Sequence, residues 1–194
     1  MKKITFDIET KNTFEDIGEN NPALLDISIV CIHDSETNKY DSFLEDDFAR
    51  LWPILEDADI LIGYNSDHFD IPLLNKHYPG DLTTFKSLDI MKEIKKSLGK
   101  RIKLDNVANA TLGEGKTGNG LEAITWWKNG EIEKIRKYCL DDVRITKAIY
   151  DFALKNGYLK YKEVNNSFNT KKIPLDTSNW EKQKDSSTTN PLLF

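Results

Sequence analysis

Short runs of β-branched and aliphatic residues in the first half of the chain predict the strands of a sheet. Asp26–His33 is rich in Ile and Val, and Lys39–Leu44 follows it across a polar turn, so this pair predicts a β-hairpin. Ile4–Ile8 and Asp59–Tyr64 are short, mostly apolar runs that predict buried strands. Lys86–Leu88 predicts a further strand. These runs lead us to expect a sheet of five to six strands.

Apolar residues spaced three or four positions apart predict helices between and after these strands. In the first predicted helix, Asp46–Asp57, apolar residues lie on both sides of Pro53. This proline predicts a kink or a late start there. The predicted helices cover Asp46–Asp57, Asp67–His77, a basic segment after Leu88, Leu104–Leu112, Leu121–Trp127 and Glu131–Leu154. Strands that come first and then alternate with helices predict an α/β fold, in which helices flank a central mixed sheet.

The composition turns polar after Asn156. We therefore expect a folded domain over residues 1–160 and a C-terminal extension over 161–194, flexible from about residue 176. The 194 residues suffice for one domain with a core. The 39% hydrophobic and 30% charged content is typical of a globular protein.

The cysteines and the N-terminal residues predict the cellular compartment of the protein. Cys31 and Cys139 lie far apart in sequence and make no metal-ligand spacing, so free thiols in a reduced, cytoplasmic protein are expected. The lysines at the N-terminus are not followed by the apolar run of a signal peptide. No segment approaches the roughly 18 apolar residues of a membrane span, so no membrane partner is expected.

The formal net charge of −5 argues weakly against a nucleic-acid partner, because phosphate binding favours a basic surface. That argument has limited force, since a site that holds divalent cations must itself be acidic. The segment Lys92–Lys103 is strongly basic and holds a single glutamate. A solvated helix face explains most of its lysines, but Lys95, Lys96 and Arg101 are also candidate contacts to a nucleic-acid backbone.

Two predicted strands carry acids at positions where α/β proteins often hold ligands. Asp7 and Glu9 lie two apart on the first strand, so their side chains leave the same face. Two carboxylates so close repel each other, and a divalent cation would remove that penalty. Asp70 falls in the first turn of the helix after the Asp59–Tyr64 strand, at a strand's carboxyl end. The alternatives are an exposed acidic strand face for the pair and a helix-dipole partner for Asp70.

The last long helix carries a further candidate pair. Tyr138 and Asp142 are four positions apart and therefore share a face of this helix. Asp141 points about 100° away from Asp142, because an α-helix has 3.6 residues per turn. We expect Asp141 to pair with Lys137 or Arg144 on the surface. A tyrosine and an aspartate at this spacing are weak evidence by themselves.

Taken in order, these residues form three motifs: Asp-x-Glu on a strand, Asn-x-x-x-Phe-Asp after a later strand, and Tyr-x-x-x-Asp on a late helix. This order resembles the three exonuclease motifs of the DEDD 3′–5′ exonuclease superfamily, in its tyrosine-bearing branch. With SLDI and LDNVANATLG between the second and third motifs, the chain is most similar to family B DNA polymerase exonuclease domains and their stand-alone ribonuclease H-like relatives. The resemblance covers roughly residues 1 to 155 and implies a ribonuclease H-like fold. In the histidine-bearing branch a histidine would replace Lys137.

The resemblance implies a metal-dependent exonuclease that releases nucleoside 5′-monophosphates, with single-stranded DNA as the favoured substrate. Two Mg²⁺ or Mn²⁺ ions, which prefer carboxylate oxygens, would be held by the four acids. By this resemblance Asp7 contacts both ions and Asp70 serves one of them, while Glu9 and Asp142 complete the site of the other. Tyr138 would orient the attacking water, because a phenol that titrates near pH 10 is a poor general base at neutral pH.

Three residues close to the acids in sequence are candidate contacts to the terminal nucleotides. Phe69 would stack on a base, a contact worth about 1–3 kcal/mol, although core packing explains this side chain equally well. Asn65 would hydrogen-bond to the substrate. Thr10 would touch the terminal sugar, or merely cap a turn.

Rival functions use some of the same features. A structure-selective endonuclease or resolvase, or an RNA-processing exoribonuclease, would need the same carboxylates, and the choice between DNA and RNA stays open. The second motif and Tyr138 favour an exonuclease over an endonuclease. A non-enzymatic binding module would be expected to lack one of the acids, and none is missing. Residues 113–118 imitate a phosphate-binding loop, but Ala110 replaces its first glycine and a predicted helix precedes it.

The chain ends in the apolar sequence NPLLF. It loosely resembles the peptide by which bacterial replication proteins dock on the sliding clamp. Asn190 would replace the usual glutamine, and Leu193 and Phe194 would fill the pocket of the clamp. The alternative, which we favour, is a terminal segment that folds back on the domain.

Overall fold

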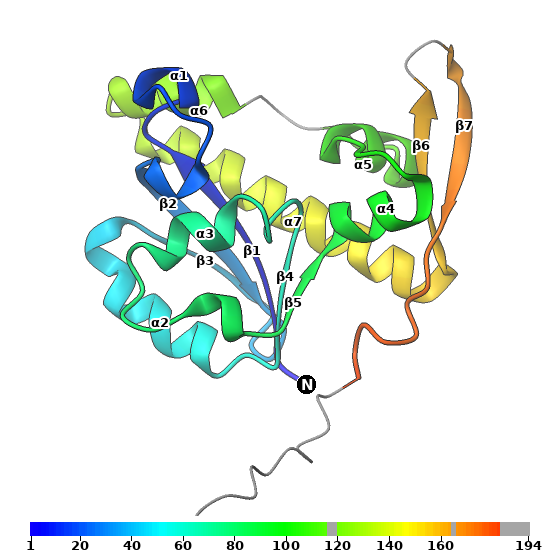
Figure 1. The fold of residues 1–194 in the computed structure, drawn as a ribbon, viewed down its shortest axis with the longest axis horizontal. Helices are drawn as coiled ribbons and strands as arrows, with labels where there is room; N and C mark the ends of the chain where they lie inside the picture. The colour runs from blue at the N-terminus through cyan, green and yellow to red at the C-terminus, as the bar shows by residue number, and fades with distance from the viewer. Residues whose placement is uncertain (116–119, 164–165, 183–194) are drawn as a thin grey trace, which may run out of the picture.

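Five strands form one mixed sheet at the centre of the computed structural model (Figure 1). The structure describes residues 1–115, 120–163 and 166–182. The strand order is β3-β2-β1-β4-β5, with β1 antiparallel to β2 and parallel to β4. The strands are β1 Lys3–Thr10, β2 Ile27–Asp34, β3 Lys39–Phe43, β4 Ile60–Gly63 and β5 Ser87–Asp89. The predicted central mixed sheet is therefore confirmed.

Helices cover both faces of this sheet. On one face α2 and α3 pack against an apolar layer from β1, β2 and β4. On the other face α7 crosses the sheet and contacts β1 and β2 (Figure 1). The helices are α1 Phe14–Ile17, α2 Phe48–Glu56, α3 Asp70–Asn75, α4 Ile90–Leu98, α5 Leu104–Leu112, α6 Gly120–Lys128 and α7 Ile132–Asn156, with short 3₁₀ turns at Pro22–Leu24, Glu45–Asp47 and Leu82–Thr84. Within the described residues, none of these helices has the length and apolar character that a membrane span requires.

The central strand β1 separates an apolar layer from the face that carries the acids. Ile4, Phe6 and Ile8 are buried in the cluster that β1 shares with α2 and α3. Because side chains alternate along a strand, Asp7 and Glu9 leave the opposite face, on which α7 packs. The alternation of the sequence thus places both carboxylates between the sheet and α7.

Helix α2 differs from the expected helix over Asp46–Asp57. A 3₁₀ turn at Glu45–Asp47 precedes it, and the helix begins at Phe48. Pro53 lies inside the helix on its exposed side, so the late start that its sequence position predicted is not seen. A proline interrupts one main-chain hydrogen bond, and the buried side chains of Leu51 and Leu55 on either side hold the helix against the sheet.

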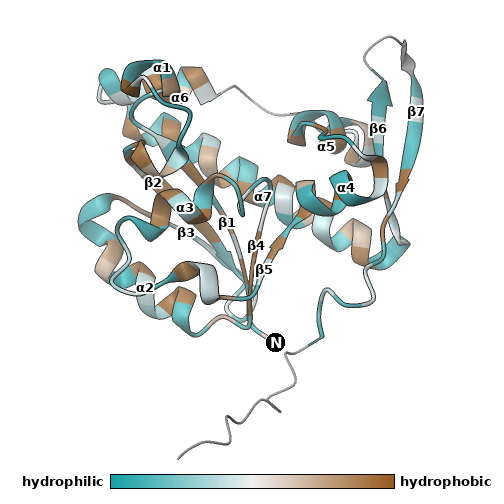
Figure 2. Cartoon of the chain, viewed as in Figure 1, coloured by the Kyte–Doolittle hydropathy of each residue, from teal (hydrophilic) through white to brown (hydrophobic). Residues whose placement is uncertain are grey.

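A second, two-stranded sheet follows α7, in a region that the sequence did not predict to contain strands. It consists of β6 Tyr158–Glu163 and β7 Asn166–Pro174, and Figure 2 shows that this hairpin is largely hydrophilic. Among the hairpin residues whose burial the structure describes, Leu159, Tyr161 and Ile173 are buried, and they join the core under α7. The expected domain boundary at residue 160 falls inside β6.

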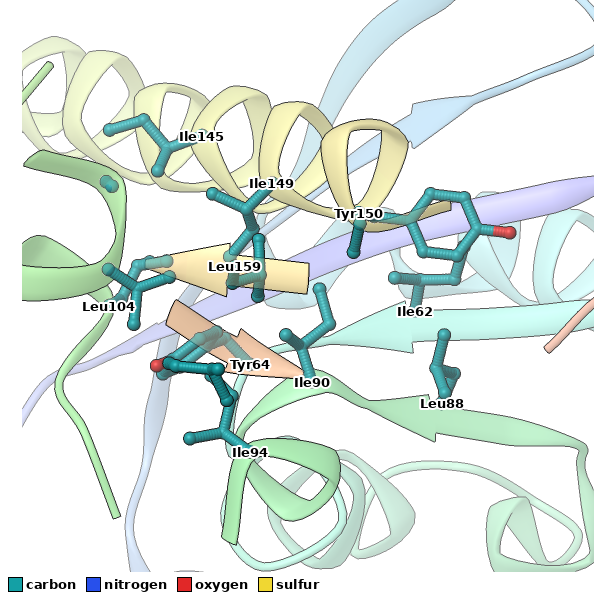
Figure 3. Packing of buried hydrophobic residues seen from close by; sticks show 14 of the residues in the cluster. Ile62, Tyr64, Leu88, Ile90, Ile94, Leu104, Ile145, Ile149, Tyr150 and Leu159 are labelled. Atoms are coloured by element: carbon teal, nitrogen blue, oxygen red, sulfur yellow. The ribbon is translucent and has the colours of Figure 1, made fainter. Parts of the chain in front are cut away.

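The second half of α7, α4, α5 and the hairpin enclose one core. Figure 3 shows Ile62 and Leu88 of the sheet facing Ile149 and Tyr150 of α7, with Leu159 of β6 packed beside them. Burying one such aliphatic side chain contributes about 1.5–3 kcal/mol. This core fixes the position of α7 over the sheet.

The C-terminal segment up to Lys182 is also attached to this core. Trp180 is only 4% exposed and stacks on the Tyr150 ring, with 5.7 Å between the ring centroids. Glu181 accepts hydrogen bonds from Lys3 Nζ at 2.7 Å and from the Tyr150 hydroxyl at 2.9 Å. The first part of the segment that we expected to be flexible therefore packs against the start of β1.

Candidate active site

Three carboxylates meet where the end of β1 lies under α7. Asp7 and Glu9 come from β1 and Asp142 from α7, and each offers an oxygen within 4.8 Å of the others. Glu9 is 8% exposed and Asp142 is 2% exposed, so solvent screens their charges poorly. Like charges at this separation favour a bound cation. A set of oxygen donors without nitrogen or sulfur suits Mg²⁺ or Mn²⁺ rather than zinc, so these residues fit the expected ions.

Asp70 is the first residue of α3, which follows the turn after β4. The residue is buried and lines the same cleft as the three acids, although it is not within 4.8 Å of all of them. Its place in the first helical turn agrees with the sequence prediction. The structure thus brings all four predicted acids to one cleft, as a group of three and a neighbour.

The cleft has a volume of about 470 Å³. It lies between the end of β1, the turn before α3, α6 and α7. Besides the four acids, its walls include Thr10, Asn65, Phe69 and Tyr138. All the predicted site residues apart from the three basic ones therefore share one cavity.

Tyr138 lies one helical turn before Asp142 and is buried. Its ring contacts the edge of Trp126 from α6, with 5.9 Å between the ring centroids. This aromatic contact restricts the ring, so its position relative to the acids is set by packing. Trp126 was not among the expected site residues. Its contact with Tyr138 joins α6 and α7, and the sequence alone does not show which side chains of two helices touch.

Cys139 fixes α7 to the strand that carries the first two acids. Its thiol donates a hydrogen bond to the main-chain oxygen of Asp7 at 3.4 Å. Burial raises the pKa of Cys139 well above its usual range, and the neighbouring Cys31, Asp7 and Glu9 raise it further. A raised pKa keeps the Cys139 thiol protonated, so it can serve as the donor of this hydrogen bond.

A buried carboxylate, Asp89, organises the turn that carries the second motif. Asn65 adopts a left-handed backbone conformation with φ of 66°, which is uncommon for a residue other than glycine. Asp89 accepts hydrogen bonds from the main-chain N–H of Asn65 at 2.8 Å, of Asp67 at 3.3 Å and of Lys92 at 3.2 Å. Burial raises the pKa of Asp89, against the lowering effect of these donors.

Sequence reasoning did not single out Asp89. The signal was an aspartate in SLDI at the N-cap of α4, a position that such residues favour. Its contacts to a turn more than twenty residues earlier appear only in the folded chain.

The second motif also depends on a close backbone approach at Gly63, the last residue of β4. A Cβ placed on Gly63 would overlap the side chain of Ser66, which is fully buried. In turn the Ser66 carbonyl accepts the N–H of Ile71 in α3. The glycine therefore permits the tight path between β4 and the helix that begins at Asp70.

Phe69 forms an aromatic wall of the cleft with Phe14 of α1, which the sequence did not indicate. Their ring centroids are 6.1 Å apart in an edge-to-face arrangement, and both side chains are partly exposed. A partly exposed ring in a cleft is available for stacking, although Phe69 also packs on the core. Thr10 lines the cleft, and its hydroxyl donates to the main-chain oxygen of Asn12 at 2.9 Å. Thr10 therefore caps a turn, one of its two expected roles.

The three basic residues that were predicted to contact a nucleic-acid backbone do not lie in one groove. Lys95 and Arg101 line a groove of about 240 Å³ that also includes His68 and that shares Asn65 with the cleft. Lys96 points away from this groove, pairs with Glu93 and lines a separate cavity. The 3.6-residue helical turn places adjacent lysines of α4 on different sides. The structure therefore places Lys95 and Arg101 in one groove and Lys96 outside it.

The sequence predicted a surface pair for Asp141 and argued against a phosphate-binding loop at residues 113–118. Arg144 Nε donates a hydrogen bond to Asp141 at 2.9 Å, and Arg144 is one of the two partners predicted for Asp141.

The segment before the glycines of residues 113–118 is helix α5, which ends at Gly113 with φ of 77°, so no strand precedes these glycines. Residues 116–119 of this segment lie outside the described residues. The clamp-docking residues Asn190, Leu193 and Phe194 also lie outside them.

Comparison with known proteins agrees with this architecture. The family model described as the RNase H superfamily matches residues 4–154. The family B DNA polymerase from the hyperthermophilic archaeon Pyrobaculum calidifontis has a similar structure, with a TM-score of 0.59 and 19% sequence identity. The similarity covers 79% of this chain and 24% of the polymerase chain, so this chain spans only a fraction of that protein. No curated protein matches the sequence. The predicted ribonuclease H-like fold is confirmed.

Proposed function

The chain belongs to the RNase H superfamily, and we propose that it is a metal-dependent 3′–5′ exonuclease of the tyrosine-bearing DEDD branch. Its favoured substrate is the 3′ end of single-stranded DNA, and its products are nucleoside 5′-monophosphates. The observation that carries this proposal is the meeting of Asp7, Glu9 and Asp142 within 4.8 Å. Asp70 and Tyr138 line the same cleft, which supports the full set of motif residues as one site.

The four acids are the residues that would hold the cations. Asp7, Glu9 and Asp142 would hold one ion, and Asp7 with Asp70 would hold the second. When bound, two such ions supply an activated water and neutralise charge on the departing 3′ oxygen. The buried position of Glu9, Asp70 and Asp142 strengthens their interaction with a cation, because little water screens it.

Tyr138 would position the attacking water through its hydroxyl. Packing against Trp126 holds the ring, so little rotamer freedom is lost when the water is bound. On the other side of the cleft, the Phe14 and Phe69 rings would stack on the terminal bases. Asn65, held by Asp89, would hydrogen-bond to the terminal nucleotide. These contacts would present the last phosphodiester to the acids.

Lys95 and Arg101 would bind the next phosphates of the strand. Their groove is continuous with the cleft at Asn65, which lines both. Among the described residues no carboxylate forms an ion pair with either side chain, so both charges are available to phosphate. Aromatic residues that can stack on bases and basic residues that can bind phosphates, lining neighbouring cavities, support a single-stranded substrate.

The test is hydrolysis of 5′-labelled DNA and RNA oligonucleotides with Mg²⁺, Mn²⁺ or chelator. We expect a ladder that shortens from the 3′ end, requires the metal and is lost in Asp7→Asn. Asp141→Asn is the matched control, since it removes a carboxylate beside Asp142 that pairs with Arg144 at the surface. Control activity should equal that of the unaltered protein.

Two results would overturn this proposal. Cleavage of a circular or 3′-blocked strand would identify an endonuclease instead. Metal-dependent hydrolysis that survives Asp7→Asn would place the reaction at another site. A ladder made from RNA and not from DNA would keep the exonuclease and change its substrate.

A further inference from the structure

The outer face of the β6–β7 hairpin gathers positive charge in an arrangement that costs stability. Lys160 and Lys172 are directly opposite each other in the antiparallel register, so their side chains leave the same face. Lys162 is two residues along β6 and shares that face. Like charges directly opposite on neighbouring strands repel each other. We call the side chains of Lys160, Lys162 and Lys172, with Tyr158, the lysine face.

Little in the described part of the chain compensates this charge. No carboxylate among the described residues forms an ion pair with Lys160, Lys162 or Lys172. Lys172 Nζ instead lies 4.1 Å from the centroid of the Tyr158 ring, and Lys162 Nζ donates to Asn109 in α5. The acid of this hairpin, Glu163, pairs with Lys171, which alternates to the other face.

Hydrogen bonds from α5 hold the main chain of the strand that carries Lys160 and Lys162. The Asn106 side chain accepts from the Lys162 N–H at 2.7 Å and donates to its carbonyl at 2.9 Å, as a neighbouring strand would. Thr111 accepts from the Lys160 N–H at 2.9 Å and donates to its carbonyl. Two side chains of α5 thus occupy the open edge of β6, while the inner face of the hairpin is buried in the core. Because the strand is held, no main-chain ordering is needed when these lysines bind a partner.

The position of the hairpin indicates the partner. The hairpin lies at the far side of α5 from the end of β1 where the acids meet (Figure 1). Over the described residues of its strands the hairpin is largely hydrophilic, as Figure 2 shows. A basic surface beside an aromatic ring, on a protein whose net charge is −5, suits a polyanion with an extended row of phosphates.

We propose that the lysine face binds the phosphate backbone of the nucleic acid at some distance from the 3′ end that enters the cleft. This inference rests on the proposed function for its choice of polyanion. The lysine face would hold the substrate between successive cleavages, and the gain would appear only with strands long enough to reach from the cleft to the hairpin. The repulsion between Lys160 and Lys172 would be relieved by the bound phosphates.

The experiment measures binding of labelled single-stranded DNA in chelator, so that hydrolysis plays no part. Oligonucleotides of about 4 and about 24 nucleotides separate the cleft from the more distant contact. For Lys160→Ala/Lys172→Ala, we expect weaker binding of the long strand and unchanged binding of the short one. For the long strand, the plot of log affinity against log salt should become less steep by about 1.4. This is about 0.7 for each lost phosphate contact.

Three comparisons control this measurement. Lys160→Arg/Lys172→Arg keeps the charge and should bind like the unaltered protein. Lys39→Ala/Lys134→Ala removes two exposed lysines from β3 and α7 and should leave the slope unchanged. The thermal midpoint of Lys160→Ala/Lys172→Ala should be unchanged or higher, since a repulsion is removed, which separates lost binding from lost folding.

An unchanged salt slope in Lys160→Ala/Lys172→Ala, or an equal loss of affinity for both strand lengths, would overturn the inference. Binding of the lysine face to anionic vesicles or to polyglutamate, with no effect on DNA, would overturn it in favour of another anion. The experiments also distinguish failure of the proposed function from failure of this inference. If the protein does not hydrolyse DNA but the length-dependent loss remains, the lysine face stands as a nucleic-acid contact and only the exonuclease assignment fails.

Discussion

At the scale of single residues, Asp89 shows how a side chain outside the motifs controls them. Its carboxylate is 5% exposed and accepts main-chain N–H groups from the turn before α3 and from the start of α4. This connection orients Asn65 and, through the following turn, the helix that carries Asp70. Asp89 acts through the main chain of this turn rather than on the substrate, so it is a positioning residue.

Asp89→Asn should impair the reaction without unfolding the chain. An amide presents one acceptor oxygen where the carboxylate presents two, so at least one N–H of the turn loses its partner. We expect kcat to fall about 10- to 100-fold, as for other residues that orient metal ligands. The Mn²⁺ concentration needed for half-maximal activity should rise as well. A fall in kcat with unchanged Mn²⁺ dependence would contradict the link from Asp89 to Asp70.

The raised pKa of Asp89 also predicts a pH dependence of stability. Because its pKa is higher in the folded than in the unfolded state, the folded state binds more protons between the ordinary value near 3.9 and the raised value. The contribution of Asp89 to the free energy of unfolding should therefore decrease as pH rises through this window. Urea unfolding at several pH values would show it as a fall in the stability of the unaltered protein relative to Asp89→Asn. Parallel curves for the two proteins would refute this origin.

Gly63→Ala tests the tight path into the second motif. The added Cβ would overlap Ser66, which has no room to move because it is fully buried. We expect a loss of about 1–3 kcal/mol in stability, typical of overpacking, and a larger relative loss of activity, because the displaced turn carries Asn65 and leads to Asp70. Chemical denaturation and oligonucleotide hydrolysis measure the two losses. Gly18→Ala, at a glycine with φ of 71° and open space around it, is a control for general backbone strain far from the second motif.

At the scale of elements, α5 joins the hairpin to the domain through side chains rather than through a sheet. Asn106→Ala removes both hydrogen bonds to Lys162 and leaves the β6 edge unsatisfied. We expect a loss of about 1–3 kcal/mol and faster hydrogen exchange in β6. Asn109→Ala is the matched control, since the Asn109 side chain accepts a hydrogen bond from the Lys162 ammonium group and, among the described residues, none from the main chain of β6. Equal effects of the two substitutions would show that the main-chain bonds are not what holds the hairpin.

The elements also show how far the sequence predicts this fold. Periodicity located the five strands of the central sheet because each has an apolar run or a clear alternation. The sequence did not predict the hairpin because, among its residues whose burial the structure describes, the buried ones are Leu159, Tyr161 and Ile173, and polar residues separate them. Asn106 and Thr111 of α5 bond to the edge of β6 from 56 and 49 residues earlier in the chain, so the local pattern does not show these contacts.

The same reasoning applies to the candidate site. Strand and helix periodicity placed Asp7, Glu9 and Asp142 on faces that could meet, and the structure brings them together. Whether Lys95 or Lys96 would face the groove depended on the rotation of α4, which its packing on the core decides through Ile90 and Ile94. Periodicity gives the face of an element, whereas partners across elements require the tertiary structure.

At the scale of the whole molecule, the charge distribution separates two tasks. Acids concentrate where β1 meets α7, and lysines extend over α4 and the hairpin, although the formal net charge is −5. The acidic centre would repel a nucleic acid until cations occupy it. Metal binding and substrate binding should therefore be coupled, because each bound cation lowers the repulsion that the approaching phosphate experiences.

This coupling leads to a prediction about stability. In chelator, the mutual repulsion of Asp7, Glu9 and Asp142 opposes folding, so Asp7→Asn should raise the thermal midpoint. With Mg²⁺ or Mn²⁺ the unaltered protein should gain stability by mass action, about 2.7 kcal/mol at a metal concentration 100 times the dissociation constant. Asp7→Asn should gain much less, because one ligand of the expected site is gone.

The measurement is thermal unfolding in chelator and at increasing Mn²⁺, with Asp141→Asn beside Asp7→Asn. Asp141 pairs with Arg144 outside the acidic group, so its loss should leave both the chelator midpoint and the metal response close to those of the unaltered protein. The order of the two variants should reverse between the conditions, since the repulsion that destabilises the metal-free protein is the same field that attracts the cation. An Asp7→Asn protein that is less stable in chelator and equally stabilised by Mn²⁺ would mean that the three carboxylates do not form the cation site.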